Sequence, residues 1–99
     1  NEFNNNLRKK KIGILGVAFK PDIDDKRDSL SIDLYEFLKK KKLNVKISDD
    51  FVKMKQLISK KKLIRESDII ILGVPHSSYK GLKISKNKFL IDTWGFFEK

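Results

Sequence analysis

The order of apolar segments along the chain predicts a single α/β domain with a mostly parallel sheet. Short apolar runs with β-branched residues, typical of buried strands, alternate with segments whose apolar residues have helical spacing. Apolar strands that alternate with helices are typical of a parallel sheet covered on both faces. With 99 residues, the chain has room for one such domain with one modest hydrophobic core.

Four segments have the composition of strands, namely residues 11–16, 43–48, 69–75 and 89–93. The third is the longest apolar run, so we expect it to be buried on both faces. Residues 1–10 are polar and rich in asparagine, and we interpret them as a linker or a frayed end that precedes the domain at 11–99. Residues 94–99 are expected to trail off after the last strand.

Two segments have the spacing of helices. Ser29 is a good N-cap, and Asp33 lies in the first turn of the helix that would follow, where an acidic residue is favoured. We expect one apolar stripe of this helix to face the sheet and four lysines to end it; the stripe is Leu30, Leu34, Phe37 and Leu38, and the lysines are 39–42. Residues 51–66 predict at least one more helix from the spacing of Phe51, Met54, Leu57 and Ile58.

The chain is strongly basic, with 23 lysines and arginines against 13 acidic residues and a net charge of +10. Proteins that recognise bases and phosphates specifically favour arginine, whose planar fork of donors matches them. Here only Arg8, Arg27 and Arg65 are arginines, and aromatic residues are not interleaved with the lysines. We therefore expect a solvated lysine-rich surface and regard nucleic acid as an unfavoured partner, while a binding patch for another polyanion stays open.

Several classes of protein are excluded or disfavoured by composition. The chain has no cysteine, which excludes disulfides, zinc–thiolate sites and a cysteine nucleophile within it, and we assign no metal ligands. No segment approaches the roughly 20 apolar residues of a membrane span, and the first residues do not have the pattern of a signal peptide. We expect a cytoplasmic protein that does not enter the membrane.

The candidate site lies where the strands end. Ligands of parallel sheets bind beyond the carboxyl ends of the strands, so the loop from Gly16 to Ser29 is the most informative segment. Lys20 follows the first strand directly and would reach a phosphate, and Arg27 lies just before the helix cap, near backbone donors that attract anions. An equally good interpretation is that both cations pair with the four aspartates of the loop. Phe19 would pack on a base or on the core.

The glycines of the first strand do not predict a nicotinamide site. Gly13 and Gly16 have the spacing G-x-x-G, whereas the dinucleotide fingerprint is G-x-G-x-x-G opening directly into a helix. A long loop containing Pro21 intervenes here, and a proline bars a helix at the residue before it.

The loop of residues 16–29 closely resembles a signature of the nucleotide-sugar dehydrogenases. The loop has the sequence Gly16-Val-Ala-Phe-Lys-Pro-Asp-Ile-Asp-Asp-Lys-Arg-Asp-Ser29, and the signature is G-L-A-F-K-P-x-T-D-D-x-R-E-S. This family includes the UDP-glucose, UDP-N-acetylmannosamine and GDP-mannose dehydrogenases, and the signature opens their carboxyl-terminal, nucleotide-sugar-binding domain. Similar segments follow at 30–49, 67–76 and 91–95. The resemblance implies a Rossmann-like three-layer domain with a mostly parallel sheet.

The resemblance also implies an activity for a longer enzyme. Members of the family oxidise the C6 alcohol of a UDP-sugar, of the UDP-glucose or UDP-N-acetylhexosamine type, to a uronic acid in two hydride transfers to NAD through a cysteine-bound intermediate. NAD, the catalytic cysteine and lysine, and the homodimer interface belong to preceding domains in such enzymes, which usually serve polysaccharide biosynthesis. We therefore assign no catalytic residue to this chain and expect it to be inactive alone.

The match to the signature implies individual roles. Phe19 and Lys20 would bind the nucleotide sugar, with Lys20 on its phosphates, and Arg27 would reach the cofactor. Trp94 stands where many members have an arginine that reaches the substrate, so that contact is either lost or replaced by the indole, and we include Trp94 among the substrate-binding residues. For His76, the only histidine, we favour a structural or loop-ordering role.

Two other functions stay open on the sequence alone. The chain would also suit a stand-alone basic α/β interaction module that binds a polyanion. It would equally suit a structural domain that has lost its ligand, which the replacement at Trp94 permits.

Overall fold

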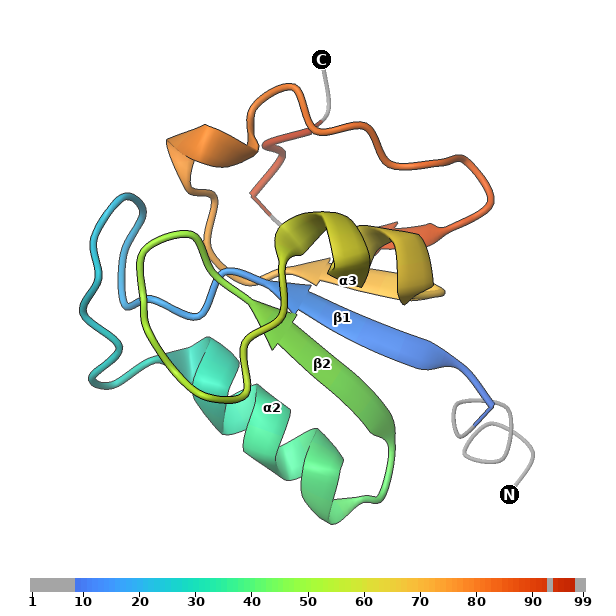
Figure 1. The fold of residues 1–99 in the computed structure, drawn as a ribbon, viewed down its shortest axis with the longest axis horizontal. Helices are drawn as coiled ribbons and strands as arrows, with labels where there is room; N and C mark the ends of the chain where they lie inside the picture. Colours follow the sequence, from blue (N-terminus) through green and yellow to red (C-terminus); the bar gives the residue numbers. More distant parts are fainter. Residues whose placement is uncertain (1–8, 93, 98–99) are drawn as a thin grey trace.

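The computed structural model describes residues 9–92 and 94–97, and it confirms the α/β fold with a parallel sheet (Figure 1). The sheet has four strands in the order β2-β1-β3-β4, and all neighbouring pairs are parallel. The strands are β1 (Lys11–Leu15), β2 (Asn44–Ser48), β3 (Ile69–Leu72) and β4 (Phe89–Ile91). The helices are α2 (Leu30–Lys40), α3 (Lys60–Glu66) and the short 3₁₀ helix η1 (Ser77–Tyr79).

Parts of three expected segments cannot be compared with this structure. Most of the linker expected over 1–10, Thr93 at the end of the fourth strand, and residues 98–99 lie outside the described residues. Within the residues that are described, no helix is both long enough and apolar enough to span a bilayer.

The two α-helices cover opposite faces of the sheet, which makes three layers (Figure 1). Side chains of a strand alternate between faces, so Ile12 and Ile14 of β1 point toward α2, whereas Leu15 belongs to the cluster on the α3 face. Each face therefore has its own half of the core. The α2 face is centred on β1 and β2, and the α3 face includes Ile70 and Leu72 of β3.

The apolar stripe expected on α2 is wrong in two of its members. Leu30 is 82% exposed and Phe37 is 56% exposed. The face that meets the sheet is instead centred on Ser31, which is buried, and includes the partly buried Leu34, Tyr35 and Leu38. At about 100° per residue, Leu30 and Phe37 lie roughly a quarter to a third of a turn away from this face. A serine at the first contact position hides the true face from hydrophobic periodicity.

The ends of α2 follow the expected chemistry. The hydroxyl of Ser29 accepts a hydrogen bond of 3.1 Å from the amide of Ile32, which confirms Ser29 as the N-cap. At the other end, Lys42 has a φ of 62°, the left-handed conformation that glycine usually supplies after a helix.

The helix expected from residue 51 begins only at Lys60. Residues 51–59 instead form a loop, near whose end Leu57 forms an isolated parallel bridge with Ile47 of β2 and the amide of Ile58 donates to the Ile47 carbonyl at 3.0 Å. Ser59 then caps α3 by accepting from the amide of Lys62. The helical spacing of the apolar residues was therefore misleading, because residues 51–59 form a loop that contains a bend and a turn, and only its end pairs with β2.

The third strand is less buried than expected. Ile70 and Leu72 are buried under the α3 face, but Ile69 and Ile71 on the opposite face are only partly buried. The reason is that α2 packs on β2, so it covers one half of its face of the sheet.

Close packing of α3 on β1 depends on Gly13. A Cβ at this position would lie 2.5 Å from Cδ2 of Leu63 and would also contact the Ser67 hydroxyl. Because Leu63 is fully buried at the centre of the α3 face, it has no free space to move into.

We expect Gly13→Ala to lower the free energy of unfolding by about 2–3 kcal/mol, because the added methyl overpacks the contact between β1 and α3. Gly81→Ala is the control, since a Cβ at Gly81 meets no atom within 4 Å and only its φ of +83° opposes a side chain, at a cost of about 1 kcal/mol. Urea unfolding measures both variants. Equal losses for the two would contradict the packing account.

Candidate functional site

The segments that follow β1, β2 and β3 meet at the carboxyl edge of the sheet (Figure 1). The first is the loop of residues 16–29, the second begins at Asp49, and the third leads through His76 into η1. Their contacts decide how the loop is held and which of its side chains face outward.

A single buried carboxylate joins these three segments. Oδ2 of Asp49 accepts hydrogen bonds of 2.7 and 3.1 Å from the amides of residues 17 and 18, and lies 2.9 Å from Nε2 of His76. Oδ1 accepts from the amides of residues 51 and 52 at 2.7 and 2.8 Å. The side chain is completely buried, so these donors replace the water that an exposed carboxylate would bind.

The environment of Asp49 favours its ionised form. Burial raises the pKa of the carboxyl group and is the largest single effect. The hydrogen bonds from the Val52 amide, from His76 and from the amides of Phe51 and Val17 together outweigh burial, so the pKa lies below its usual value. Asp49 is therefore an anion that the fold needs, held by donors from all three segments.

The contacts of His76 fix both its tautomer and its role. Its Nδ1 accepts a hydrogen bond of 2.7 Å from the amide of Asp22, so this nitrogen carries no proton. The proton then lies on Nε2, which donates to Asp49. The imidazole is fully buried and packs against the rings of Phe51 and Tyr79, with centroids 4.6 and 5.3 Å away. His76 thus orders the loop, which is the role that the sequence favours.

Asp22 makes a second attachment between the loop and η1. It has a φ of 63°, a left-handed conformation that aspartate tolerates better than most residues. Its Oδ1 accepts from the amide and the hydroxyl of Ser77 at 2.7 and 3.0 Å. The Ser77 amide is the main cause of a lowered pKa at Asp22.

The two cations of the loop differ in their pairing. Arg27 is 86% exposed and forms a two-pronged ion pair with Asp25, in which Nη2 donates to Oδ2 at 2.8 Å and Nε donates to Oδ1 at 3.1 Å. This pair, together with the Arg27 amide, lowers the pKa of Asp25 to about 2. Over residues 9–92 and 94–97, Lys20 has no ion-pair partner, and its ammonium lies 5.8 Å from the ring centroid of Phe19. The sequence allowed both cations to form ion pairs with aspartates of the loop, and in the described part of the chain Arg27 alone forms one.

Phe19 and Trp94 line one pocket, although they are far apart in the sequence. The pocket has a volume of about 140 Å³ and lies at the amino end of α2, between the loop and the end of β3. It is lined by Ala18, Phe19, Pro21, Asp28, Leu30, Ser31, Gly73, Val74 and Trp94. Two of the four candidate site residues are thus brought together, while Lys20 and Arg27 do not line the pocket.

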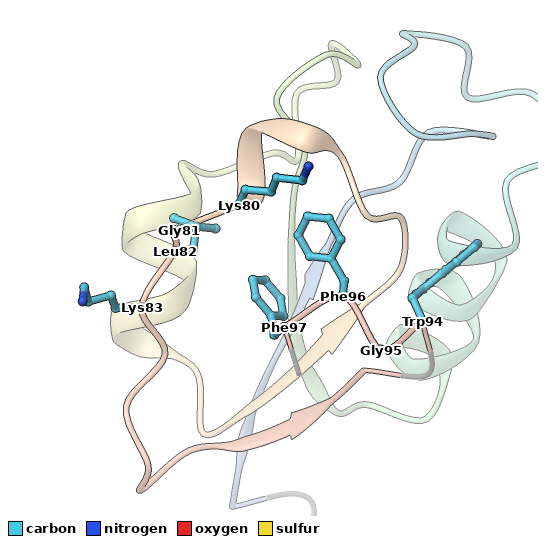
Figure 2. Close-up of a pocket in the computed structure, with 8 residues that line it drawn as sticks. All are labelled: Lys80, Gly81, Leu82, Lys83, Trp94, Gly95, Phe96 and Phe97. Atoms are coloured by element: carbon cyan, nitrogen blue, oxygen red, sulfur yellow. The ribbon is translucent and has the colours of Figure 1, made fainter. Parts of the chain in front are cut away.

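A second, larger pocket of about 690 Å³ lies between residues 80–83 and 94–97. Figure 2 shows the rings of Phe96 and Phe97 pointing into this space and the indole of Trp94 pointing the other way, toward α2. Phe96 and Phe97 are partly buried against the α3 face, and the Phe97 amide donates to Asp92 at 2.7 Å. The expectation that the chain simply trails off after residue 94 is therefore wrong for these two aromatic residues.

The described part of the chain has no cluster of three or more histidine, cysteine, aspartate or glutamate side chains arranged to hold a metal ion. Asp50, next to Asp49, instead accepts hydrogen bonds of 2.6 Å each from the Lys60 ammonium and from the hydroxyl of Ser78. The aspartates at this edge of the sheet thus serve hydrogen bonds and ion pairs.

We expect Asp49→Asn to lower the free energy of unfolding by about 3 kcal/mol at neutral pH, because the amide nitrogen would face backbone N–H donors that need an acceptor. Asp50→Asn, which weakens a partly exposed ion pair, should cost below about 1 kcal/mol. Denaturant unfolding compares the two, and similar losses would contradict the central role of Asp49.

The pH dependence gives a second measure of the same group. Because the folded-state pKa of Asp49 lies below the unfolded value of 3.8, its stabilisation is complete well above pH 4 and is lost as the pH falls through the folded-state pKa. The stability of Asp49→Asn should therefore fall less between pH 5 and the acid limit than that of the unsubstituted chain. Parallel pH profiles would show that Asp49 does not titrate as its contacts require.

Known proteins resemble this chain in sequence and in fold. The family model of the UDP-glucose/GDP-mannose dehydrogenase family, UDP binding domain, matches residues 13–99. No curated protein sequence matches the chain significantly.

Several solved structures of longer dehydrogenases contain a region that resembles this chain. The chain is 27% identical to GDP-mannose dehydrogenase from Pseudomonas aeruginosa, with a TM-score of 0.79, over 91% of this chain and 26% of that one. It is 22% identical to the UDP-N-acetyl-mannosamine dehydrogenase from Staphylococcus aureus, with a TM-score of 0.79, over 99% and 26%. For the UDP-D-ManNAc dehydrogenase from Pyrococcus horikoshii the identity is 25% and the TM-score 0.68, over 83% and 20%.

The chain spans about a quarter of the length of these structures or less. The family match covers most of the chain, including the loop of residues 16–29 and all the residues that hold it in place. The chain therefore belongs to the UDP-glucose/GDP-mannose dehydrogenase family, as its UDP binding domain.

Proposed function

We propose that this domain binds the UDP-sugar substrate of an NAD-dependent 6-dehydrogenase that oxidises the sugar C6 alcohol to a uronic acid. The observation that carries the proposal is the loop of residues 16–29, which has the family signature and is anchored from inside by Asp49 and His76. This anchoring leaves Phe19 and Lys20 exposed at the carboxyl edge of the sheet, where ligands of parallel sheets bind.

Lys20 is the residue best suited to the phosphates of the substrate. It is exposed, it has no ion-pair partner over residues 9–92 and 94–97, and it lies beside Phe19 at the end of β1. A lysine ammonium binds phosphate as a point charge without needing a fixed fork of donors. Phe19 and Trp94 would contact the other parts of the nucleotide sugar from the pocket that they share.

Arg27 would contact the cofactor only from the edge of this domain. The glycine spacing on β1 does not provide a dinucleotide site, so NAD would bind mainly to another domain. When bound there, NAD supplies the hydride acceptor for the oxidation. Arg27 would exchange the Asp25 carboxylate for a phosphate of the cofactor, because the same exposed guanidinium serves either anion.

The domain's contribution to the reaction would be binding and orientation. It has no cysteine, so the covalent step would have to take place elsewhere in a longer enzyme, and we expect this chain alone to be inactive. We further propose that this enzyme is a cytoplasmic homodimer that serves polysaccharide biosynthesis, with a linker over residues 1–10 joining the domain at 11–99 to the domains before it. The family match and the short span of the chain within its structural relatives support a longer enzyme with further domains.

Titration of the ¹⁵N-labelled chain with UDP-glucose tests the proposal. We expect amide shifts at Phe19 and Lys20, and about a fivefold weaker affinity for Lys20→Ala, the equivalent of losing roughly 1 kcal/mol of phosphate contact. Lys40→Ala is the matched control, because it removes an exposed lysine at the opposite end of α2.

Two results would contradict the proposed function. Shifts confined to residues outside the loop of residues 16–29 would disprove the site. Equal losses for Lys20→Ala and Lys40→Ala, with an affinity that falls steeply with salt and ignores the nucleotide, would favour a basic module that binds polyanions.

A further inference from the structure

The basic charge of the chain is concentrated at the amino edge of the sheet, opposite the candidate site. All four parallel strands begin at this edge, and α2 and α3 end there, each just before the next strand (Figure 1). We call residues 9–11, 39–43, 65–68 and 86–89 the amino-edge surface. It contains ten basic residues against two acidic ones, Glu66 and Asp68. The basic residues are the lysines 9–11, 39–42, 86 and 88, together with Arg65.

The segments that follow β1, β2 and β3 are balanced in charge by comparison. Residues 16–29, 49–59 and 73–80 together contain six lysines and arginines and six aspartates. Most of the net charge of +10 therefore belongs to the amino-edge surface. Charge of one sign gathered at one end of a protein attracts an anionic partner to that end.

The lysines of the amino-edge surface are not neutralised by the carboxylates beside them. All nine except the partly buried Lys88 are exposed, and within residues 9–92 and 94–97 none of them forms an ion pair. Glu66 lies 3.8 Å from Arg65, and Asp68 accepts a hydrogen bond of 2.9 Å from the amide of Lys11. An anionic partner would therefore reduce the repulsion among these lysines.

Two exposed phenylalanines accompany the lysines. Phe89 begins β4 and is 64% exposed; Phe37, 56% exposed, lies in the last turn of α2, where the Lys41 ammonium is 5.4 Å from its ring centroid. Phe89 pairs with Ile69, which packs on the α2 face, so both rings lie on the same side of the sheet. The surface thus combines ammonium groups with large apolar side chains.

We propose that the amino-edge surface binds an anionic lipid bilayer, with its lysines at the headgroup phosphates and with Phe37 and Phe89 at the boundary of the acyl chains. Lysines near an anionic bilayer attract it without a fixed hydrogen-bond geometry. Aromatic side chains among basic ones are typical of protein surfaces that lie on a membrane. The loop of residues 16–29, at the opposite edge, then faces away from the bilayer and stays open to its ligand.

The composition of the surface favours lipid over nucleic acid. Arginine, whose fork of donors suits bases and the nucleic-acid backbone, occurs once among the ten basic residues, and that Arg65 lies beside Glu66. A lysine acts as a point charge, which is sufficient for headgroup phosphates that move in the plane of a bilayer.

Cosedimentation of the chain with lipid vesicles tests the proposal. At roughly 0.1 M salt we expect binding to phosphatidylcholine vesicles that contain about 30% phosphatidylglycerol, and no binding to phosphatidylcholine alone. Higher salt should weaken the binding, because it screens the charges. UDP-glucose should not displace the chain, since the candidate site lies at the other edge. Displacement would place the bilayer at that site and overturn the proposal.

Two double variants separate position from net charge. Lys10→Ala with Lys40→Ala should bind anionic vesicles about 25-fold more weakly, since each lysine near the bilayer contributes about a factor of five. Lys26→Ala with Lys55→Ala is the matched control, because it removes the same charge from exposed positions in the balanced segments. It should bind within about twofold of the unsubstituted chain, since those charges lie beyond the screening length.

The apolar contact has its own pair of variants. Phe89→Ser should weaken the binding to anionic vesicles about tenfold, because the ring no longer leaves water. Leu30→Ser removes an apolar side chain that is 82% exposed at the other end of α2, and it should bind vesicles like the unsubstituted chain.

Three further results would overturn the membrane proposal. Absence of binding to anionic vesicles at low salt is the first, and equal weakening by the two double variants is the second. The third is tighter binding to double-stranded DNA than to vesicles, unchanged by Phe89→Ser, which would identify nucleic acid as the partner. Each leaves the proposed function intact, because the titration with UDP-glucose follows residues at the opposite edge of the sheet.

Discussion

The arrangement of the carboxyl edge depends on the need of one buried anion for donors. A carboxylate without water must be surrounded by hydrogen-bond donors, and Asp49 finds four backbone amides and one imidazole N–H. These donors belong to segments that follow three different strands. They converge because β2, β1 and β3 lie side by side and parallel. The strand order therefore brings the donors to Asp49, and their hydrogen bonds to Asp49 stabilise that strand order.

The strands could be predicted from the sequence because each is a short apolar run with clear limits, and the start of α2 because Ser29 is a local signal. The face of α2 that meets the sheet could not be predicted from the sequence. It is centred on Ser31, which is buried because the helix lies close to Gly73, a residue far away in the sequence. The prediction of a helix over residues 51–59 was wrong for a related reason. Their apolar residues have helical spacing, but Leu57 and Ile58 pair with the edge of β2, and periodicity along the sequence does not reveal that partner.

For the candidate site, the signature motif singled out Phe19, Lys20 and Arg27, but it did not reveal which of them are free. The sequence offers Arg27 four aspartates within the loop, and only the structure shows that Asp25 is its partner. In the sequence, Asp49 is simply the residue that follows the second predicted strand, 43–48. Its signal was present in outline, as an acidic residue and the only histidine at the ends of two strands of one parallel sheet, yet their contact depends on strand order, which composition does not give.

One side of the same loop is held by hydrogen bonds to the rest of the domain. Asp49 and His76 bind the amides of residues 17, 18 and 22, and Ser77 binds the carboxylate of Asp22, so these groups of the loop are hydrogen-bonded before any ligand arrives. Little ordering of the backbone then remains to be done on binding, which lowers the entropic cost. On the outer side, the Lys20 ammonium, which has no ion-pair partner within residues 9–92 and 94–97, lies 5.8 Å from the centroid of the Phe19 ring. Charge and ring surface are thus neighbours, an arrangement that is compatible with the nucleotide sugar of the proposed function.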